Sequence, residues 1–176
     1  MPTIEKRNIV GNSLVPHSEN AEAAAKGTAI LQLVTFKLGE EQFAVDILKV
    51  QEINRMTAIT KMPNSPHEVE GIVNLRGKVI PIVNLRKKIG MPEKENDEHS
   101  RIMIMNIQGI TMGLIVDAVD EVLRIPVNIV ESSPTVAMGI SSELIKGIAK
   151  LEDRLIVLIN LQSLFGIEDI ALIESL

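Results

Sequence analysis

Short apolar runs separated by polar turns make up most of the chain. The run between Lys78 and Asn84 is continuously apolar and contains four β-branched residues, Val79, Ile80, Ile82 and Val83. A short approach, Gly71–Leu75, and a tight turn at Arg76-Gly77 precede it. Continuous runs of this length and composition are typical of strands buried on both faces. The pattern therefore predicts a protein built mainly from short strands.

The same pattern occurs twice. Residues 71–86, GIVNLRGKVIPIVNLR, resemble residues 147–162, GIAKLEDRLIVLINLQ. Chance would give roughly one or two identities in such a window for this composition. The similarity indicates an internal duplication. The identities are Gly71, Ile72, Leu75, Ile80, Asn84 and Leu85, which match Gly147, Ile148, Leu151, Ile156, Asn160 and Leu161.

A second pair of segments supports the duplication. Residues 36–46 and 107–117 each consist of a predicted strand, a turn and a strand that ends in Val-Asp, which is typical of a β-hairpin. A similar amphipathic segment follows each hairpin, Val50–Ile53 in the first half and Val119–Val122 in the second. We therefore expect two copies of one strand-rich unit.

The remaining elements follow from apolar spacing and turn residues. We expect a mobile polar tail over residues 1–28, a helical turn at 67–71 and a short helix at 85–90 that ends at Gly90. Residues 47–53 fit either a helical turn or a bent strand. The other expected elements are strands at 30–37, 42–46, 57–60, 101–107, 110–117 and 119–125 and a closing helix at 168–176.

These elements predict an all-β barrel fold in two halves. We expect one domain over residues 29–172, divided into a first half, 29–95, and a second half, 96–176, with the C-terminal helix. The charged stretch Met91–Ser100 would connect the halves. Exchange of strands between the halves is left open.

Composition narrows the class of protein. The 176 residues carry a formal net charge of −5, no cysteine and three aromatic residues, all phenylalanine. A nucleic-acid partner would demand clustered cationic side chains, and base stacking would demand more aromatic rings. The apolar runs are too short to span a membrane, and the start, MPTIEKRN, lacks the apolar stretch of a signal peptide. We expect a cytoplasmic protein without disulfides or direct membrane insertion.

Enzymatic chemistry is not predicted. The three histidines, His17, His67 and His99, form no recognisable metal-binding motif, and no phosphate-binding glycine motif or Gly-x-Ser-x-Gly motif occurs. Asp46 and Asp117 are made equivalent by the duplication, so similar surroundings would give them similar pKa values. A general acid–base pair needs those values pushed apart. We expect both aspartates to bond to neighbouring turns, and we expect no catalytic residue, cofactor or metal.

Two features are not explained by folding alone. Arg76 lies at a predicted turn tip where the second half has Glu152, so the scaffold does not demand arginine there. Arg76 is either a surface arginine without a specific role or a residue that contacts a partner. Val136 and Met138 are apolar residues in a segment punctuated by Ser, Pro and Gly. They indicate either a contact site or a loop folded back onto the core.

Two long blocks carry a resemblance to a known family. Residues 39–53, GEEQFAVDILKVQEI, and 71–83, GIVNLRGKVIPIV, strongly resemble the CheW family of bacterial chemotaxis coupling proteins, and the resemblance covers about residues 28–172. It implies two five-stranded SH3-like barrels with short helices and a groove between them. It also implies a non-enzymatic adaptor that joins the cytoplasmic tip of chemoreceptors (methyl-accepting chemotaxis proteins) to the regulatory domain of the histidine kinase CheA.

The resemblance also implies roles for particular residues. The loop from Glu131 to Ile140, with Val136 and Met138, resembles a kinase-side contact of the family. In the receptor groove, a guanidinium at the turn would bind carboxylates or carbonyls of a receptor helix, above an apolar floor. The receptor-facing groove matches Val50, Glu52, Ile53, Ile59, Arg76 and Gly77, with Val119 on the opposite wall.

Rival hypotheses share parts of this evidence. A free-standing relative of the kinase regulatory domain, another non-enzymatic signalling scaffold, or a coupling protein that normally carries a receiver domain would have the same fold. A hydrolase that uses Asp46 or Asp117 is the enzymatic alternative, and a nucleic-acid-binding small barrel is opposed by charge and aromatic content. We expect a protein that is monomeric alone and is recruited to membrane-bound receptor arrays.

Overall fold

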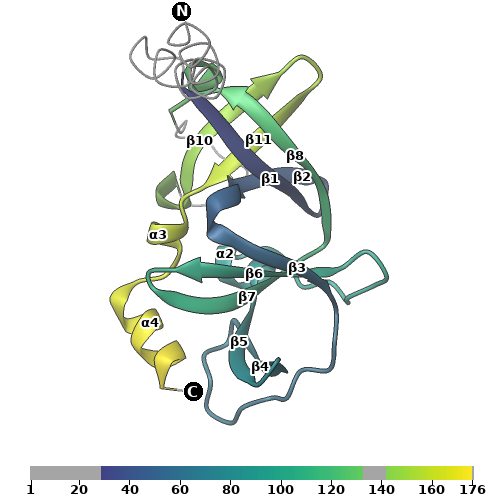
Figure 1. Ribbon diagram of the computed structural model, residues 1–176, viewed down its shortest axis with the longest axis vertical. Helices are drawn as coiled ribbons and strands as arrows, with labels where there is room; N and C mark the ends of the chain where they lie inside the picture. Colours follow the sequence, from purple (N-terminus) through teal and green to yellow (C-terminus); the bar gives the residue numbers. More distant parts are fainter. Residues whose placement is uncertain (1–28, 133–141, 176) are drawn as a thin grey trace, which may run out of the picture.

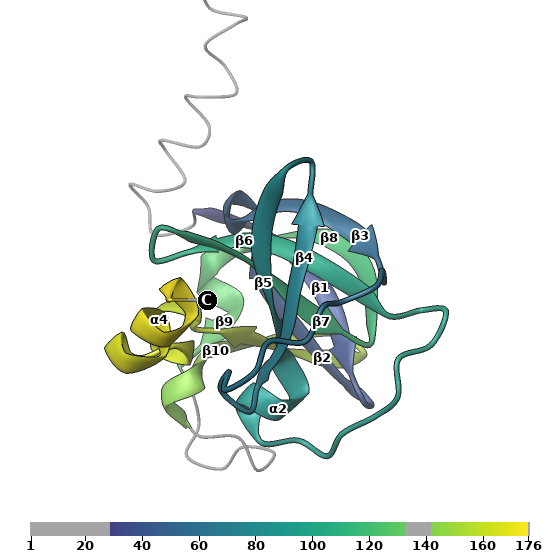
Figure 2. The same ribbon diagram turned by 90° about the horizontal axis from the view of Figure 1, so that it is seen from below.

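The computed structural model describes residues 29–132 and 142–175 (Figure 1). The expected tail, residues 1–28, and the candidate contact residues Val136 and Met138 lie outside this range. Most of the described elements are strands, and they form two mixed sheets. The sheets lie one above the other along the long axis of the molecule, and each curls into a small barrel (Figures 1 and 2). The all-β fold with two SH3-like barrels is confirmed, but one of the sheets has six strands where five were expected, because the two-residue strand Val130–Glu131 adds to its edge.

The chain starts in one sheet with β1 and β2, builds the other sheet with β3 to β7, and returns to the first with β8 to β11. The six-stranded barrel has the order β8-β1-β2-β11-β10-β9, and the five-stranded barrel has the order β3-β6-β7-β5-β4. The first contains β1 (Ile30–Leu38), β2 (Glu41–Asp46), β8 (Ala118–Pro126), β9 (Val130–Glu131), β10 (Ile145–Leu151) and β11 (Arg154–Ile159). The second contains β3 (Val50–Arg55), β4 (Val69–Leu75), β5 (Lys78–Asn84), β6 (Arg101–Ile107) and β7 (Ile110–Val116). The helical segments are η1 (Ile47–Lys49), α2 (Leu85–Ile89), η2 (Val127–Ile129), η3 (Ser142–Leu144), α3 (Leu161–Leu164) and α4 (Ile167–Glu174).

Each half of the chain gives one hairpin to the barrel of the other half. The β1–β2 hairpin lies between β8 and β11, antiparallel to β8 and parallel to β11. The β6–β7 hairpin lies in the same way between β3 and β5. The boundary expected near residue 95 therefore does not separate the two sheets, because strand exchange takes place. A hairpin cannot leave its barrel without unpairing both neighbours, so the two barrels form one folding unit.

The strand registers reveal the duplication directly. Val50 of β3 pairs with Met105 of β6, and Val119 of β8 pairs with Phe36 of β1, in both cases next to a shift in register. The amphipathic segments that follow the two hairpins are thus equivalent in space as well as in sequence. Each barrel consists of a hairpin from one half and the remaining strands of the other half.

One detail of the sequence alignment is wrong by two residues. Phe43 lies opposite Phe36 in the first hairpin, whereas Met112 lies opposite Met105 in the second. The structural equivalent of Phe43 is therefore Met112, and Asp46 and Asp117 do not occupy equivalent places. The turns have different sequences, and only the pairing around each turn fixes the register.

Three apolar clusters fill the molecule. The largest draws buried side chains from both sheets, so it joins the barrels, and each large side chain buried there contributes roughly 1.5–3 kcal/mol. Its members include Phe36, Phe43, Met103, Met105, Met112, Leu114 and Phe165. A second cluster lies within the six-stranded barrel and contains Leu33, Ala44, Ile125, Ala149, Ile156 and Leu158. The third lies within the five-stranded barrel and contains Val73, Ile80, Ile82, Ile102, Ile104 and Ile115.

The repeated Asn-Leu pair starts a short helix in each half. The side chains of Asn84 and Asn160 each accept a hydrogen bond of 3.3 Å from the backbone N–H three residues ahead. Asparagine is a favoured N-cap because its short side chain satisfies one of the free N–H groups of the first turn. Leu85 and Leu161, which follow the caps, are buried. The helix predicted at 85–90 is confirmed, and it ends at Gly90 with φ 82°.

Other local predictions were less accurate. For residues 47–53 the sequence left a helical turn and a bent strand as alternatives. The structure has both, because the helical turn η1 is followed directly by the strand β3. The helical turn expected at 67–71 is wrong, since Val69 already pairs with Val83 as the first residue of β4. The strand expected at 57–60 is reduced to one bridge between Thr60 and Ile72. In these places pairing with a distant strand overrides the local preference.

Gly71 and Gly147 occupy equivalent bulges, where another segment passes close to the hairpin. A Cβ atom on Gly71, where φ is 150°, would lie 2.1 Å from the carbonyl oxygen of Thr60. We expect Gly71→Ala to lower the free energy of unfolding by roughly 3 kcal/mol or more. The control Gly77→Ala, at φ 84° with open space around it, should cost only about 1 kcal/mol. Urea denaturation followed by circular dichroism measures both, and equal losses would contradict the steric argument.

Candidate functional site

β3 and β8 are edge strands of the two sheets, and both present aliphatic side chains beside the shared core. Val50 and Ile53 of β3 pair with buried methionines of β6, and Val119 of β8 pairs with Phe36. These partners belong to the cluster that joins the barrels. Directly opposed residues of an antiparallel pair point to the same face. Val50, Ile53 and Val119 therefore all face the region between the barrels.

The duplication adds a fourth residue that the sequence analysis missed. Val122 pairs with buried Val34 on β1, at the place equivalent to that of Ile53. Val50 and Val119 are half-buried against the shared core, whereas Ile53 is 39% exposed and Val122 is 53% exposed. The start of β8 passes β3 in both ribbon views (Figures 1 and 2). We call these four residues, Val50, Ile53, Val119 and Val122, the seam.

A polar feature lies on the other face of β3. Glu52 and Asn54 alternate with Ile53, so they point toward the end of the five-stranded barrel. Arg76 reaches across from the β4–β5 turn and forms an ion pair with Glu52. A hollow of about 260 Å³ lies beside this pair, with the barrel residues Val73, Leu75, Ile102 and Ile104 among those that line it.

The turn that carries Arg76 has the geometry predicted from its sequence. Arg76 and Gly77 have φ values of 52° and 84°, and left-handed values at both central positions are those of a type I′ hairpin turn. The backbone N–H of Gly77 donates to the side-chain oxygen of Asn74 at 2.9 Å. The turn projects the guanidinium outward, and the Arg76 side chain is 72% exposed.

The ion pair between Arg76 and Glu52 is exposed, and a group of a partner protein can take the place of Glu52 in it. A hydrogen bond of 2.8 Å from the Asn54 side chain is the largest influence on Glu52; together with Arg76 it outweighs burial and lowers the pKa of that carboxyl. Glu52 is therefore ionised at neutral pH. Exposed ion pairs contribute little to stability because water competes with them. A carboxylate or carbonyl of a partner can therefore replace Glu52 on Arg76 at small cost.

The six-stranded barrel carries a related pair in a different position. Glu121 is the structural equivalent of Glu52, and it lies 3.6 Å from Arg154. Arg154 comes two residues after Glu152, the counterpart of Arg76, and it lies on the strand β11. Its side chain is 31% exposed. The scaffold thus repeats the arginine–glutamate pair, but only the five-stranded barrel presents the arginine from its turn.

The seven predicted receptor residues do not form one surface. Val50, Ile53 and Val119 belong to the seam, while Glu52, Arg76 and Gly77 lie at the barrel end on the other face of β3. Ile59 belongs to neither group, because it is half-buried and packs against the interior of the five-stranded barrel. The prediction therefore brings together two neighbouring patches and one structural residue.

The predicted kinase-side contact lies elsewhere. Glu131 is the last residue of β9, is exposed and forms an ion pair of 3.3 Å with Lys150. β9 and β8 are the opposite edges of the six-stranded sheet. The sheet curls into a barrel, and only η2 lies between the end of β8 and the start of β9. Glu131 is thus separated from Val119 and Val122 by the rest of β8 and by η2. Val136 and Met138, the other two predicted residues, lie outside the described part of the chain.

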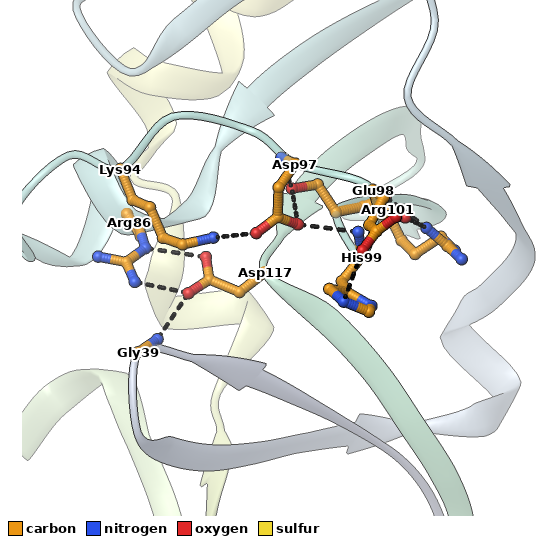
Figure 3. A network of polar contacts seen from close by, with 9 residues as sticks. Gly39, Arg86, Lys94, Asp97, Glu98, His99, Arg101 and Asp117 are labelled. Carbon is orange, nitrogen blue, oxygen red and sulfur yellow. Dashed lines mark hydrogen bonds and ion pairs between the residues drawn. The ribbon is translucent and has the colours of Figure 1, made fainter.

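A two-pronged ion pair joins Arg86 and Asp117, two residues before Val119 in the sequence (Figure 3). Arg86 of α2 donates from Nε to Oδ1 of Asp117 at 2.8 Å and from Nη2 to Oδ2 at 2.5 Å. The same Oδ2 accepts a hydrogen bond of 2.7 Å from the backbone N–H of Gly39, in the β1–β2 turn. The Nη1 of Arg86 donates to the carbonyl of Pro92 at 2.7 Å. We call Arg86, Asp117 and the Gly39 N–H the fork.

The fork holds both side chains in their charged forms. The hydrogen bond to Asp117, the largest influence, raises the pKa of Arg86. Burial is the largest influence on Asp117 and raises the pKa of its carboxyl, but the hydrogen bonds from Arg86 and Gly39 and the nearby positive charges outweigh it. The net result is a pKa for Asp117 below its ordinary value of 3.8. Sequence reasoning missed this pair because its members are 31 residues apart.

The two aspartates considered as a catalytic pair both form structural hydrogen bonds, which are local for Asp46 and long-range for Asp117. Asp46 caps η1 by accepting a hydrogen bond of 2.9 Å from the backbone N–H of Leu48, and Asp117 belongs to the fork.

Within residues 29–132 and 142–175, no group of three or more His, Cys, Asp or Glu side chains could hold a metal ion. No helix of the described chain is long and apolar enough to cross a membrane.

Together, the exchanged barrels, the exposed aliphatic seam and the outward-facing arginine define a protein that works by docking to other macromolecules. The comparisons with known proteins specify the family. A model of the CheW-like domain matches residues 32–169. The chain therefore belongs to the CheW family of chemotaxis scaffolds.

Individual relatives agree with this assignment. The chemotaxis protein CheW of Klebsiella aerogenes is 31% identical over 82% of this chain and 87% of its own length. That of Treponema pallidum is 34% identical over 82% and 88%, respectively. Among solved structures, the crystal structure of the scaffolding protein TtCheW from Thermoanaerobacter tengcongensis aligns with a TM-score of 0.73 and 42% identity. That alignment covers 79% of this chain and 90% of the other.

The fork predicts a pH-dependent contribution to stability. The pKa of Asp117 is lower in the folded than in the unfolded chain, so its contribution is present above pH 3.8 and is lost as the pH falls below that value. We expect Asp117→Asn to cost roughly 2 kcal/mol at neutral pH, as for hydrogen bonds to charged groups. Urea denaturation at several pH values should show the two proteins converging below pH 3.8. A difference that stays constant across this range would contradict the assignment.

Proposed function

We propose that this protein couples the cytoplasmic tip of chemoreceptors to the regulatory domain of the histidine kinase CheA. The seam is the observation that carries the proposal. It places four aliphatic side chains from the edges of both barrels on one surface, two of them substantially exposed. Exposed aliphatic groups gathered in this way mark protein interaction sites. An amphipathic receptor helix is the partner that such a surface fits.

Arg76 supplies a polar contact beside the apolar one. Its guanidinium is exposed, and its present partner, Glu52, is replaceable by a carboxylate or carbonyl of the receptor helix. Planar guanidinium groups recognise such acceptors through two parallel hydrogen bonds. Ile53 of the seam follows Glu52 directly on β3, so the two patches adjoin along one edge strand. Because β3 is an edge strand, one helix that lies along its open edge would reach side chains on both faces.

A second surface would meet the kinase. Glu131 lies on β9, which follows the far end of β8 after η2 and is therefore separate from the seam, and Val136 and Met138 follow it in sequence. Separate surfaces allow one protein to hold both partners at the same time. Binding is then the whole function, and signals pass as shifts in the population of kinase states. Recruitment to membrane-bound receptor arrays follows from the receptor contact.

Reversing the charge at the exposed turn tests the polar contact. We expect Arg76→Glu to weaken pull-down of a receptor cytoplasmic fragment, because it places a carboxylate beside Glu52 and removes the guanidinium. Binding of the kinase regulatory domain and the midpoint of thermal unfolding should stay nearly unchanged. Arg154→Glu, the same reversal at the related pair of the other barrel, is the matched control and should retain receptor binding. Normal receptor binding by Arg76→Glu would show that the site is misassigned.

A charge placed in the seam tests the apolar contact. Val119→Asp should weaken receptor binding at least tenfold, since a buried unpaired carboxylate at an interface costs more than the roughly 1.4 kcal/mol that a tenfold change represents. Leu155→Asp changes an exposed aliphatic side chain on β11, away from the seam, and should bind receptor normally. Titration calorimetry with the receptor fragment measures both. Equal effects of the two changes would argue against a specific role for the seam.

A further inference from the structure

Arg86 is a nearly buried cation in a place that the second half of the chain fills differently. It is only 9% exposed. The residue that follows the second Asn-Leu pair is Gln162, which is exposed. The start of the helix therefore needs the asparagine cap and the leucine but not an arginine. Because burial of a cation is costly unless it is paired, the contacts of Arg86 are the reason to look for its role.

Those contacts fasten one barrel to the other. Arg86 belongs to α2, which follows β5 of the five-stranded barrel. Gly39 belongs to the turn of the β1–β2 hairpin in the six-stranded barrel. The carboxylate of Asp117 binds both at once, and the backbone N–H of Asp117 donates to the carbonyl of Lys37 at 3.0 Å. Asp117 is thus held from two sides, through its backbone and through both carboxylate oxygens (Figure 3).

Asp117 lies at the point where the chain crosses between the barrels. It is the single residue between β7, in the five-stranded barrel, and β8, in the six-stranded barrel. Val119 of the seam follows two residues later. The other crossing, from β2 to β3, is made by η1 and is capped locally by Asp46. The fork thus fixes the direction in which β8 leaves the crossing and with it the place of Val119.

We propose that Arg86 and Asp117 are positioning residues for receptor docking: they hold the start of β8 so that Val119 stays aligned with Val50 in the seam. This inference rests on the proposed receptor contact of the seam. Neither residue touches the partner in this scheme. Their effect passes through the backbone of residues 117–119, so that loss of the fork disturbs the seam while leaving Glu131, beyond the far end of β8, in place.

The experiment compares three variants of the full-length protein. Arg86→Gln introduces the residue type that the second half uses, and Asp117→Asn keeps an acceptor for the Gly39 N–H but removes the charge. Lys88→Gln is the matched control, because Lys88 lies on the same helix but pairs with Asp169 at 2.9 Å and Glu68 at 3.7 Å. Titration calorimetry measures binding to a receptor cytoplasmic fragment and to the kinase regulatory domain, at a temperature where circular dichroism shows every variant to be folded.

Both fork variants should bind the receptor fragment about tenfold more weakly and the kinase domain within twofold of the unmodified protein. The control should bind both within twofold. Adding Arg86→Gln to Val119→Ala should weaken receptor binding less than the two separate effects would predict, because both act at one place. Nuclear magnetic resonance should show the Val119 amide shifting in the fork variants and not in the control.

Three results would overturn the inference: normal receptor binding by both fork variants, equal loss of receptor and kinase binding, or additive effects with Val119→Ala. If Arg86→Gln fails to fold, Asp117→Asn carries the test, and unfolding of both would assign the fork to stability alone. The proposed function is tested separately by Val119→Asp. If that change weakens receptor binding while the fork variants do not, only the positioning role fails. If it has no effect, the seam itself is not the receptor site.

Discussion

The reach of the chain at the two crossings is the constraint on which the rest of the structure depends. β7 ends at Val116, beside Arg101 on β6. If β8 paired with its own hairpin, Val119 would have to lie beside Met105, four residues along β6 and two strand spacings away. That distance is roughly 17 Å, whereas three residues of extended chain span about 11 Å. The single residue Asp117 therefore forces β8 into the other barrel, and exchange of hairpins follows.

The candidate site is a product of this exchange. β3 and β8 are the strands that follow the two crossings, and each becomes the edge of the barrel that it enters. Val50 and Val119 lie at or near the starts of these strands, so the crossings bring them to the boundary between the barrels. Duplication alone would make the two edges alike. The features with a specific proposed role, Arg76 and Arg86, lie where the halves differ, since their counterparts are Glu152 and Gln162.

Much of the fold could be predicted from the sequence because its signals are local. β-Branched runs, the Arg76-Gly77 turn and the repeated Asn-Leu pair each specify a strand, a turn or a helix start within a few residues. The exchange could not be predicted in this way, because it depends on the distance between distant strands. The fork was missed for the same reason, and Val122 was missed although the duplication already matched it with Ile53. Glu52 and Ile53 were found as neighbours in sequence, but only the strand geometry shows that they point to opposite faces.

Exchanged barrels suit a protein that holds two partners at once. Neither barrel can move away from the other without breaking the pairs on both sides of a hairpin and exposing the cluster between them, so hinge motion between the barrels is suppressed. The seam at the start of β8 and Glu131 beyond its end belong to the same sheet and keep a fixed spacing. A rigid scaffold cannot transmit a signal by bending. It can do so by holding its proposed partners, receptor and kinase, in a geometry where a change in one alters the populations of the other.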